Sequence, residues 1–240
     1  MTIVKKFGGK SLETKEAIYN VAKICKDDYE KGNNIILVLS ARGNETDNLI
    51  KEAKSISNIY EKREMDMLLV TGEQKAIAIM CNAFCKLKVP AVSLNAYQIP
   101  IYTDSNFGSA KIKNIGTKRI KRELSMNKIV IIAGFQGIDK DNNYTTLGRG
   151  GSDLTAVAIA AKLKADKCEI YKDVDAVYSK DPKVDANAVK YNKLNFNEML
   201  ELSNTGAKIL QDKSVEIAKE NNVPIFIKSI FTNKVGTIIS

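Results

Sequence analysis

IILVLS, residues 35–40, is a continuous run of apolar residues that ends in a serine. A strand without polar alternation is typical of a parallel sheet covered by helices on both faces. Before this run, Ile3–Phe7 has the pattern of another strand, and Leu12–Lys31 carries apolar residues with a helical period. After it, the polar residues of Ala41–Asp47 indicate a loop. The start of the chain therefore predicts two strands of a parallel sheet joined by a helix.

The alternation of strands and helices continues to the end of the chain. Further strands are expected at Ala91–Leu94, Lys128–Ala133, Cys168–Tyr171, Pro224–Lys228 and Gly236–Ile239. Further helices are expected from Thr71 to about Lys86 and over Asp153–Lys164, Asn195–Ser203 and Ala207–Glu220. The chain has only four prolines and no linker-like segment, so we expect one α/β domain over residues 1–240, with a mostly parallel sheet and helices on both faces.

The composition excludes several classes of function. The 240 residues contain no histidine, which rules out a Ser-His-Asp or Cys-His nucleophilic site and any His-ligated metal site. No apolar run reaches the ~20 residues of a membrane span, and no signal peptide is visible. The four cysteines lack a zinc-like spacing. We therefore expect a cytoplasmic protein with reduced thiols, no resident metal site and no membrane partner.

The net charge of +9 raises the question of nucleic-acid binding. Most of the basic residues are lysines that are interleaved with acidic residues along the chain. The one dense basic segment, Lys111–Arg122, has isoleucines at helix-compatible positions, which favours a solvated helix face over a phosphate-rich partner. We expect no nucleic-acid partner, and the charge is equally consistent with small anionic ligands.

Polar and glycine-rich loops follow the predicted strands. In open sheets of this type, ligands bind at the carboxyl ends of the strands. The loops in question are Gly8–Ser11, Ser40–Asp47, Gly134–Asp153 and Asp173–Lys183. The sequence thus predicts one composite site built from these loops.

The first of these loops, Gly8–Ser11, lies between a strand and a helix, where backbone amides attract phosphate. It is not a Walker A motif, because the position that should hold the first glycine is Val4. For this loop, two interpretations therefore remain: a contact with phosphate, or a simple tight turn.

Glu73 lies at the expected start of a helix. It could be an acidic residue that favours the helix N-terminus, or it could be a functional residue.

The loop TTLGRGGSD, residues 145–153, is more specific. Its three glycines permit close approach of the backbone, and Ser152 or Asp153 could cap the helix that follows. Arg149 is one of only five arginines, and a guanidinium group suits a carboxylate clamp better than an ammonium group does. An incidental arginine on a surface loop is the alternative.

Carboxylates, an aromatic ring and a lysine gather in the segment from Asp173 to Lys183. Such a group could hold a nucleotide, although an Asp-Pro turn explains part of it without function. Lys208, at the expected start of the last long helix, could reach a phosphate or point to solvent.

Seven motifs taken together resemble the catalytic domain of the aspartate kinases, within the amino-acid kinase superfamily. In chain order they are KFGGxS (6–11), SAxG (40–43), TGEQ (71–74), GFQG (134–137), TLGRGGSD (146–153), DVD (173–175) and GAKILQ (206–211). The resemblance runs from about residue 3 to residue 239. It implies a three-layer α/β/α sandwich and transfer of the γ-phosphoryl group of ATP, with Mg²⁺, to the β-carboxylate of L-aspartate. That reaction is a first step toward lysine, threonine and methionine.

The resemblance also implies roles for individual residues. Lys6, Gly8, Gly9 and Asp153 match the catalytic positions. Ser40, Thr46, Glu73, Arg149 and Ser152 match the aspartate-binding positions, with Arg149 on the α-carboxylate and Glu73 on the α-ammonium group. Lys172, Asp173, Tyr178, Lys183 and Lys208 match the nucleotide-contacting positions.

Two departures from the family pattern stand out. Lys10 replaces a common threonine and brings a second cation to the phosphate loop. The chain ends where aspartate kinases usually continue into ACT regulatory domains, so we expect no ACT domain in this chain. A separate regulatory subunit could then supply the regulation. We also expect a homodimer. Another acceptor carboxylate, or a weakly catalytic binding protein of the same fold, is the alternative function.

Overall fold

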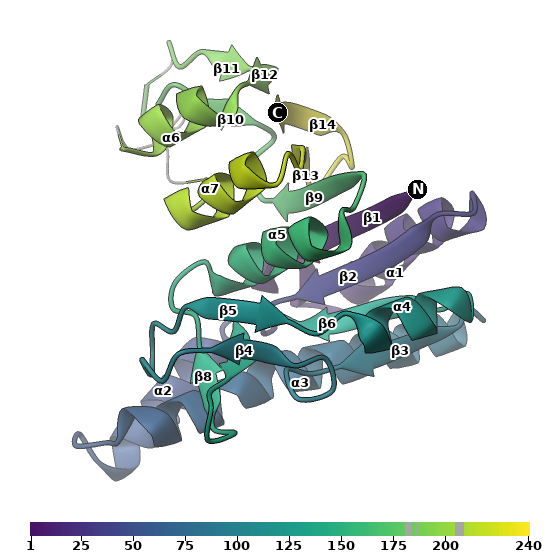
Figure 1. Cartoon of the computed structure of the whole chain (residues 1–240). Helices are drawn as coiled ribbons and strands as arrows, with labels where there is room; N and C mark the ends of the chain where they lie inside the picture. Colours follow the sequence, from purple (N-terminus) through teal and green to yellow (C-terminus); the bar gives the residue numbers. More distant parts are fainter. Residues whose placement is uncertain (181–183, 186, 205–208) are drawn as a thin grey trace.

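The computed structural model describes residues 1–180, 184–185, 187–204 and 209–240. Its centre is an eight-stranded sheet in the order β12-β14-β13-β9-β1-β2-β6-β3 (Figure 1). The strands of this sheet are β1 (Thr2–Phe7), β2 (Asn34–Leu39), β3 (Ala91–Leu94), β6 (Ile129–Ala133), β9 (Lys167–Lys172), β12 (Lys193–Leu194), β13 (Ile225–Ser229) and β14 (Val235–Ile239). Among these strands only β13 and β14 pair antiparallel, which confirms the predicted mostly parallel sheet.

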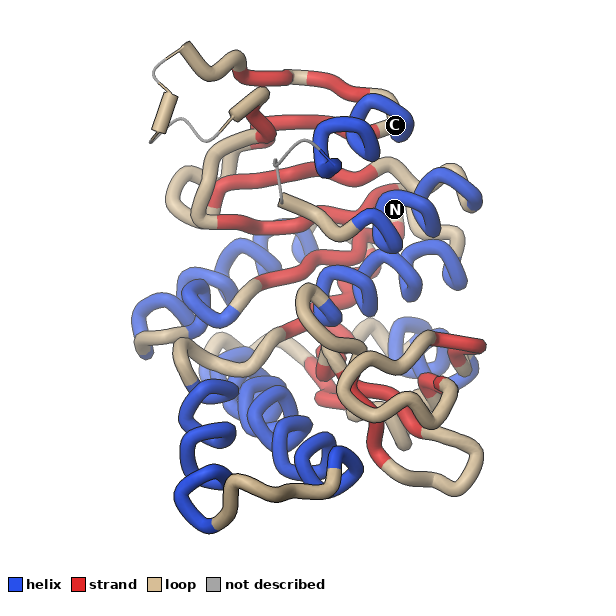
Figure 2. Tube along the Cα trace, turned by 90° about the vertical axis from the view of Figure 1, so that its left-hand side faces the viewer, coloured by secondary structure: helices blue, strands red, loops and turns tan. Residues whose placement is uncertain are grey.

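Helices cover both faces of this sheet (Figure 2). The helical segments are η1 (Gly9–Leu12), α1 (Lys15–Glu30), α2 (Glu45–Ile56), α3 (Lys62–Lys86), α4 (Lys118–Ser125), α5 (Gly151–Leu163), α6 (Phe196–Asn204) and α7 (Asp212–Glu220). Helices α1 and α3 pack on one face, and α4 and α5 pack on the other, with α7 against α5. No described helix is both long enough and apolar enough to cross a membrane.

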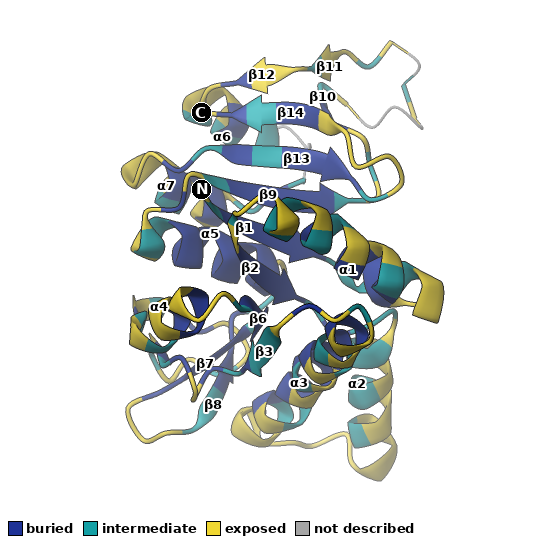
Figure 3. Ribbon diagram, turned by 90° about the vertical axis from the view of Figure 1, so that its right-hand side faces the viewer, coloured by how far each residue is buried: buried dark blue, intermediate teal, exposed yellow. Residues whose placement is uncertain are grey.

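Each face of the sheet has its own apolar core. The strands between the two cores, such as β1, β2 and β9, are coloured as buried along most of their length in Figure 3. Alternate residues of β2 point to opposite sides, so that Ile36 and Val38 join one core and Ile35, Leu37 and Leu39 join the other. All five side chains are fully buried. The prediction that the apolar run at residues 35–39 is buried on both faces of the sheet is therefore confirmed.

A second, four-stranded sheet corrects one prediction. Its order is β5-β4-β7-β8, from β4 (Ile101–Thr103), β5 (Ile112–Ile115), β7 (Gln136–Ile138) and β8 (Tyr144–Thr146). The expected loop at Gly134–Ser152 thus contains a hairpin, β7–β8, before α5 begins at Gly151. A two-stranded pairing of β10 (Val177–Tyr178) with β11 (Lys190–Tyr191) similarly interrupts the expected loop after β9.

The dense basic segment is only partly the helix that the sequence predicts. Its first half forms strand β5, and helix α4 begins at Lys118, after Gly116. The solvated face is confirmed for Lys121 and Arg122. In addition, the buried carboxylate of Glu123 forms ion pairs with Arg119, Arg122 and Lys128. These contacts hold the pKa of Glu123 at about 2, so part of the local positive charge is neutralised within the fold.

Helix α3 corrects a second prediction. The segment TGEQ (71–74) does not start a helix but lies in the middle of this 25-residue helix. Position 72 favours glycine because α3 passes close to the loop after β2. A Cβ on Gly72 would lie 2.9 Å from the Cβ of Ala41. The glycine reflects close packing rather than a helix boundary. Glu73 is therefore not an N-terminal cap.

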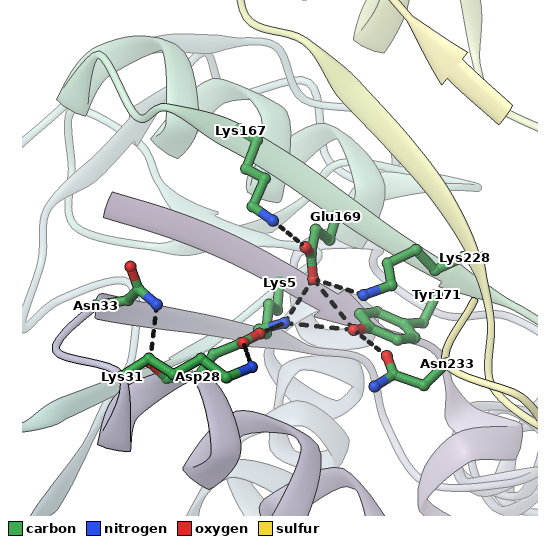
Figure 4. Close-up of polar contacts among 9 residues, drawn as sticks. All are labelled: Lys5, Asp28, Lys31, Asn33, Lys167, Glu169, Tyr171, Lys228 and Asn233. Atoms are coloured by element: carbon green, nitrogen blue, oxygen red, sulfur yellow. Dashed lines mark hydrogen bonds and ion pairs between the residues drawn. The ribbon is translucent and has the colours of Figure 1, made fainter. Parts of the chain in front are cut away.

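A buried network of charges lies on the face of the sheet that α1 covers (Figure 4). Glu169 on β9 receives three ammonium groups: Lys5 at 2.5 Å, Lys167 at 2.7 Å and Lys228 at 3.5 Å. Lys5 also pairs with Asp28 of α1 at 2.8 Å. Burial opposes ionisation of Glu169, but the lysines outweigh it and hold the pKa of this carboxyl at about 2. One carboxylate thus joins β1, β9 and β13.

Removing this carboxylate is expected to be costly. We predict that Glu169→Gln lowers the free energy of unfolding by about 3–5 kcal/mol at pH 7, because it leaves buried lysines without their counter-charge. Urea denaturation measures the loss. Glu30→Gln, which breaks an exposed pair with Lys26 on α1, is the matched control and should change stability by no more than about 0.5 kcal/mol. Equal effects of the two substitutions would contradict the assigned role of Glu169.

Candidate active site

The candidate site lies where the chain changes direction across the sheet. In the sheet, β1 lies between β2 and β9. After β1 the chain runs to β2, whereas after β9 it runs to strands on the opposite side of β9, of which β13 is the direct neighbour. A crevice at such a point is the usual ligand site of an open parallel sheet. Two cavities lie at this end of the strands, and we name them after the elements beside them.

The β1 cavity has a volume of about 340 Å³ and is polar in its lining residues. It is lined by Lys6, Gly8, Gly9, Ser40, Ala41, Gly43, Thr46, Glu73, Phe135, Gly148, Arg149, Gly150, Gly151, Ser152, Asp153 and Lys172. All four predicted catalytic residues and all five predicted substrate-binding residues are among them. Three of the four predicted loops meet here, as expected for a composite site.

The α7 cavity, of about 510 Å³, lies between the glycine-rich loop and the start of α7. It is lined by Arg149, Gly150, Asp153, Lys172, Ser203, Ile209, Leu210, Gln211, Asp212 and Lys213. Four residues line both cavities: Arg149, Gly150, Asp153 and Lys172. The two cavities therefore meet at one carboxylate, one lysine and one arginine.

Asp153 is the charged centre of this junction. Its Oδ1 lies 2.7 Å from Nζ of Lys6 on β1, and its Oδ2 lies 2.5 Å from Nζ of Lys172 at the end of β9. Burial opposes the charged form of Asp153, but the two lysines outweigh it and lower the pKa of this carboxyl. Burial lowers the pKa of Lys6, although Asp153 counteracts it. The arrangement holds two cations side by side at the carboxyl ends of adjacent strands.

The loop after β1 is packed tightly against the loop after β2. The backbone N–H of Gly43 donates to the carbonyl of Gly9 at 3.0 Å. A Cβ on Gly9 would lie 2.7 Å from the carbonyl oxygen of Ala41, so only glycine fits at this position. The tight approach brings Gly8 and Gly9 into the lining of the β1 cavity beside Lys6.

Glu73 projects from α3 to the same cavity. One carboxylate oxygen, Oε1, accepts a hydrogen bond from the backbone N–H of Ala41 at 3.0 Å. The other, Oε2, is buried without a hydrogen-bond partner among the described residues. Burial raises the pKa of Glu73 to about 7, despite the hydrogen bond from Ala41. A buried, unpartnered carboxylate oxygen in a cavity lining is suited to an incoming cation or hydrogen-bond donor.

The glycine-rich loop presents Arg149 to both cavities. Arg149 is exposed, and its guanidinium group forms no ion pair with a described residue. Helix α5 follows at once, with Gly150 as its N-cap residue in the left-handed conformation (φ 71°) and no side-chain cap. The suggestion that Ser152 or Asp153 caps this helix is therefore wrong, since Asp153 pairs with the two lysines.

Gln211, the N-cap residue of α7, closes the other side of this loop. Its side-chain amide donates a hydrogen bond to the carbonyl of Arg149. A Cβ on Gly150 would lie 2.8 Å from the Gln211 side chain, which adds a packing reason for glycine. Gln211 lies in the quoted GAKILQ motif, but the sequence did not single it out as a site residue.

The predicted nucleotide-contacting residues are placed less uniformly. Lys172 lines both cavities, whereas Asp173 and Tyr178 line neither of them. Asp173 pairs with Lys10 at 2.6 Å, and the Tyr178 hydroxyl donates to Asp175 at 2.9 Å. Lys183 and Lys208 lie outside the described residues, and so do Gly206 and Ala207, where the sequence predicts a helix start. The described helix α7 begins at Asp212.

Phe135 is a site residue that sequence reasoning missed. It lines the β1 cavity and has a φ of 68°, which is rare for a bulky side chain. Its N–H donates to Thr155 Oγ1 at 3.1 Å, and its carbonyl accepts from the N–H of Leu147 at 2.9 Å. Its place in the GFQG motif was the available signal, but the identity of a phenylalanine gives no sign of a positive φ.

Comparison with known proteins identifies the family of the chain. Residues 1–229 match the model of the amino acid kinase family. An aspartokinase from Geobacillus stearothermophilus is 48% identical over 237 residues, and an aspartate kinase (Ask_LysC) from Stutzerimonas stutzeri is 47% identical over 238 residues. Each alignment covers 99% of this chain and 58% of the relative, so the chain spans less than two thirds of these proteins.

Solved structures give the same result. The crystal structure of aspartate kinase from Synechocystis superposes with a TM-score of 0.89 and is 40% identical. The superposition covers all of this chain and 39% of that chain. The predicted similarity to aspartate kinases is confirmed.

The ionisation of Glu73 can be tested without any ligand. We predict that its carboxyl titrates near pH 7, measured by ¹³C NMR of side-chain carboxyl resonances, with Glu73→Gln identifying the resonance. The folded protein then binds more protons than the unfolded chain between about pH 4.5 and 7, so this residue lowers stability as the pH rises through that window. A titration midpoint near 4.5 would show that the carboxylate is hydrated rather than buried.

Proposed function

Because the chain belongs to the amino acid kinase family, we propose that it is the catalytic domain of an aspartate kinase, which transfers the γ-phosphoryl group of MgATP to the β-carboxylate of L-aspartate. One observation carries the proposal: the β1 and α7 cavities meet at Asp153, Lys172 and Arg149. Two substrates held in these cavities would have their reacting groups beside a pair of lysines. Identities of 48% and 47% to aspartate kinases support aspartate as the acceptor.

The β1 cavity suits a small amino acid that carries two carboxylates. The guanidinium group of Arg149, unpaired among the described residues, would bind the α-carboxylate through two parallel hydrogen bonds. Glu73 Oε2 would accept from the α-ammonium group, which removes the cost of leaving this buried oxygen unpartnered. The hydroxyl groups of Ser40, Thr46 and Ser152 line the same cavity and would complete the polar contacts.

The α7 cavity suits the nucleotide. Its volume of about 510 Å³ lies in the range usual for small-molecule sites, and Lys172 is one of its lining residues. Phosphates that enter from this side would meet Lys172 first and then Lys6, which lies on the other side of Asp153. Asp173, Tyr178, Lys183 and Lys208 remain proposed nucleotide contacts on the basis of the family resemblance alone.

The chemistry requires alignment and neutralisation of charge more than proton transfer. A carboxylate acceptor is already ionised at neutral pH, so no general base is needed, and a chain with no histidine can carry out the reaction. Lys6 would stabilise the charge on the transferred phosphoryl group, and the backbone amides of Gly8 and Gly9 would lie beside it. Asp153 would keep Lys6 and Lys172 at a fixed spacing while the substrates align.

Mg²⁺ is expected to arrive as part of the nucleotide substrate. The described part of the chain has no group of three or more acidic or cysteine side chains that could hold a metal ion. Mg²⁺ commonly keeps several waters and binds mainly through substrate phosphates in kinase sites. We therefore assign no resident metal ligand among the described residues.

Acyl-phosphate trapping tests the proposed reaction. Purified protein with MgATP, L-aspartate and hydroxylamine should give aspartyl hydroxamate. Product that forms only with another acid in a panel of carboxylates would instead identify a related carboxylate kinase. Binding of MgATP and aspartate without turnover would identify a binding protein of the same fold.

Two substitutions should separate stabilisation of the transition state from binding of aspartate. Lys6→Ala is expected to lower kcat roughly 10²–10³-fold with a small change in the KM for aspartate, because it removes charge stabilisation from the transition state. Arg149→Ala is expected to raise the KM for aspartate roughly 10–100-fold, because it removes a charged hydrogen-bonding partner of the substrate.

Arg149→Lys is the matched control, since it keeps the charge and loses the planar fork; its KM should lie between those of the wild type and Arg149→Ala. Steady-state kinetics in both substrates measure these effects. An unchanged KM and kcat in Arg149→Ala would refute the carboxylate-clamp role.

A further inference from the structure

A buried aspartate outside both cavities ties together the segments that build the β1 cavity. Asp66, in the first half of α3, is 1% exposed. Its Oδ2 accepts from the backbone N–H groups of Thr146 at 2.8 Å and Gly108 at 2.9 Å. Its Oδ1 accepts from the hydroxyl group of Thr146 at 2.7 Å. One carboxylate thus joins α3, the turn before β5 and the end of β8.

These hydrogen bonds fix the start of the loop that carries Arg149. Thr146 is the last residue of β8 and lies three positions before Arg149. The carbonyl of Thr146 accepts from the N–H of Ala110 at 2.8 Å, and a Cβ on Gly148 would lie 3.2 Å from the carbonyl oxygen of Gly108. The turn around Gly108 therefore supports the glycine-rich loop, and Asp66 holds both.

The same helix carries Glu73. Asp66 and Glu73 are seven residues apart, two helical turns, so they lie on one face of α3 about 10.5 Å apart along its axis. Between them, the carbonyl of Val70 accepts from the side-chain amide of Gln136 on β7 at 3.3 Å. A rigid helix thus connects the position of Thr146 with the position of the Glu73 carboxylate.

We propose that Asp66 is a positioning residue, which sets the location of Arg149 relative to Glu73 and so the affinity of the β1 cavity for its acceptor amino acid. This inference rests on the proposed function. The two groups would bind opposite charges on one small ligand, so a displacement of one relative to the other weakens both contacts. Arg149 also lines the α7 cavity, but that cavity receives no residue from α3, and the phosphate contacts proposed there are lysines rather than Arg149. We therefore expect loss of Asp66 to change nucleotide affinity much less than affinity for the acceptor.

The experiment compares substitutions that differ in the hydrogen bonds they keep. Asp66→Ala removes all three. Asp66→Asn can keep all three, with its oxygen toward the two N–H groups and its amide donating to the Thr146 hydroxyl. Thr146→Val removes only the hydroxyl bond and is mild enough to fold should Asp66→Ala fail to do so.

Asp139 provides the matched structural control. It is 2% exposed and accepts from the backbone N–H groups of Asp141 at 3.0 Å and Asn143 at 2.8 Å. These bonds close the turn between β7 and β8, and no residue of that turn lines either cavity. Asp139→Ala thus removes a buried, backbone-binding carboxylate from the turn between β7 and β8 without changing the hydrogen bonds at the start of the Arg149 loop.

The measurements are the KM for aspartate, the KM for MgATP and the melting temperature. Asp66→Ala should raise the KM for aspartate at least tenfold and change the KM for MgATP less than twofold. Asp66→Asn should remain within about threefold of the wild type for aspartate, and Thr146→Val should show a rise of about threefold. Asp139→Ala should lower the melting temperature and leave both KM values unchanged.

The inference fails if Asp66→Ala and Thr146→Val lower the melting temperature as Asp139→Ala does and leave the KM for aspartate at the wild-type value. It also fails if the KM values for both substrates rise together. If the proposed function itself is wrong, the wild-type protein will form no aspartyl hydroxamate. This result separates failure of the proposed function from failure of the positioning role of Asp66. In that case, calorimetric titration of the same variants with aspartate measures the positioning effect as a change in Kd.

Discussion

Lys6 and Lys172 are brought together by the sheet itself. Lys6 lies opposite Ile170 in the parallel pairing of β1 with β9, so Lys172, two residues on, points to the same face. Two ammonium groups in a nearly buried position repel each other unless an anion lies between them. Asp153 supplies that anion, and its place in the first turn of α5 adds the favourable field of the helix N-terminus. Helix α5, both strands and both cavities thus depend on one carboxylate.

The neighbouring residue on β1 meets the same constraint on the other face. Lys5 is fully buried and is neutralised by Glu169 and Asp28, just as Lys6 is neutralised by Asp153. A central strand buried on both faces can carry consecutive lysines only if each face provides a carboxylate. A shift of β1 by one residue would place each lysine on the face of the other, so the two charge clusters reinforce the register that the backbone hydrogen bonds define.

The sequence predicts the features that depend on local pattern, and it fails where packing between distant segments decides. The sheet is predicted correctly from the apolar run at residues 35–39. The position of the candidate site, at the carboxyl ends of the strands, is predicted correctly from the glycine-rich loop around Arg149. Gly72 suggests a helix boundary, but α3 continues through it because the helix passes close to Ala41. Asp66 could not be found, since its partners lie 42 and 80 residues away in the chain.

Lys10 shows how a departure in sequence can leave the centre of a site intact. Its position in η1, beside the phosphate loop, suggests a second cation near the reacting group. In the structure its side chain is 75% exposed, pairs with Asp173 at 2.6 Å and lines neither cavity. Such an exposed pair contributes little to stability. The positive charge of Lys10 is therefore directed to the loop after β9, and the geometry of Lys6, Asp153 and Lys172 does not depend on it.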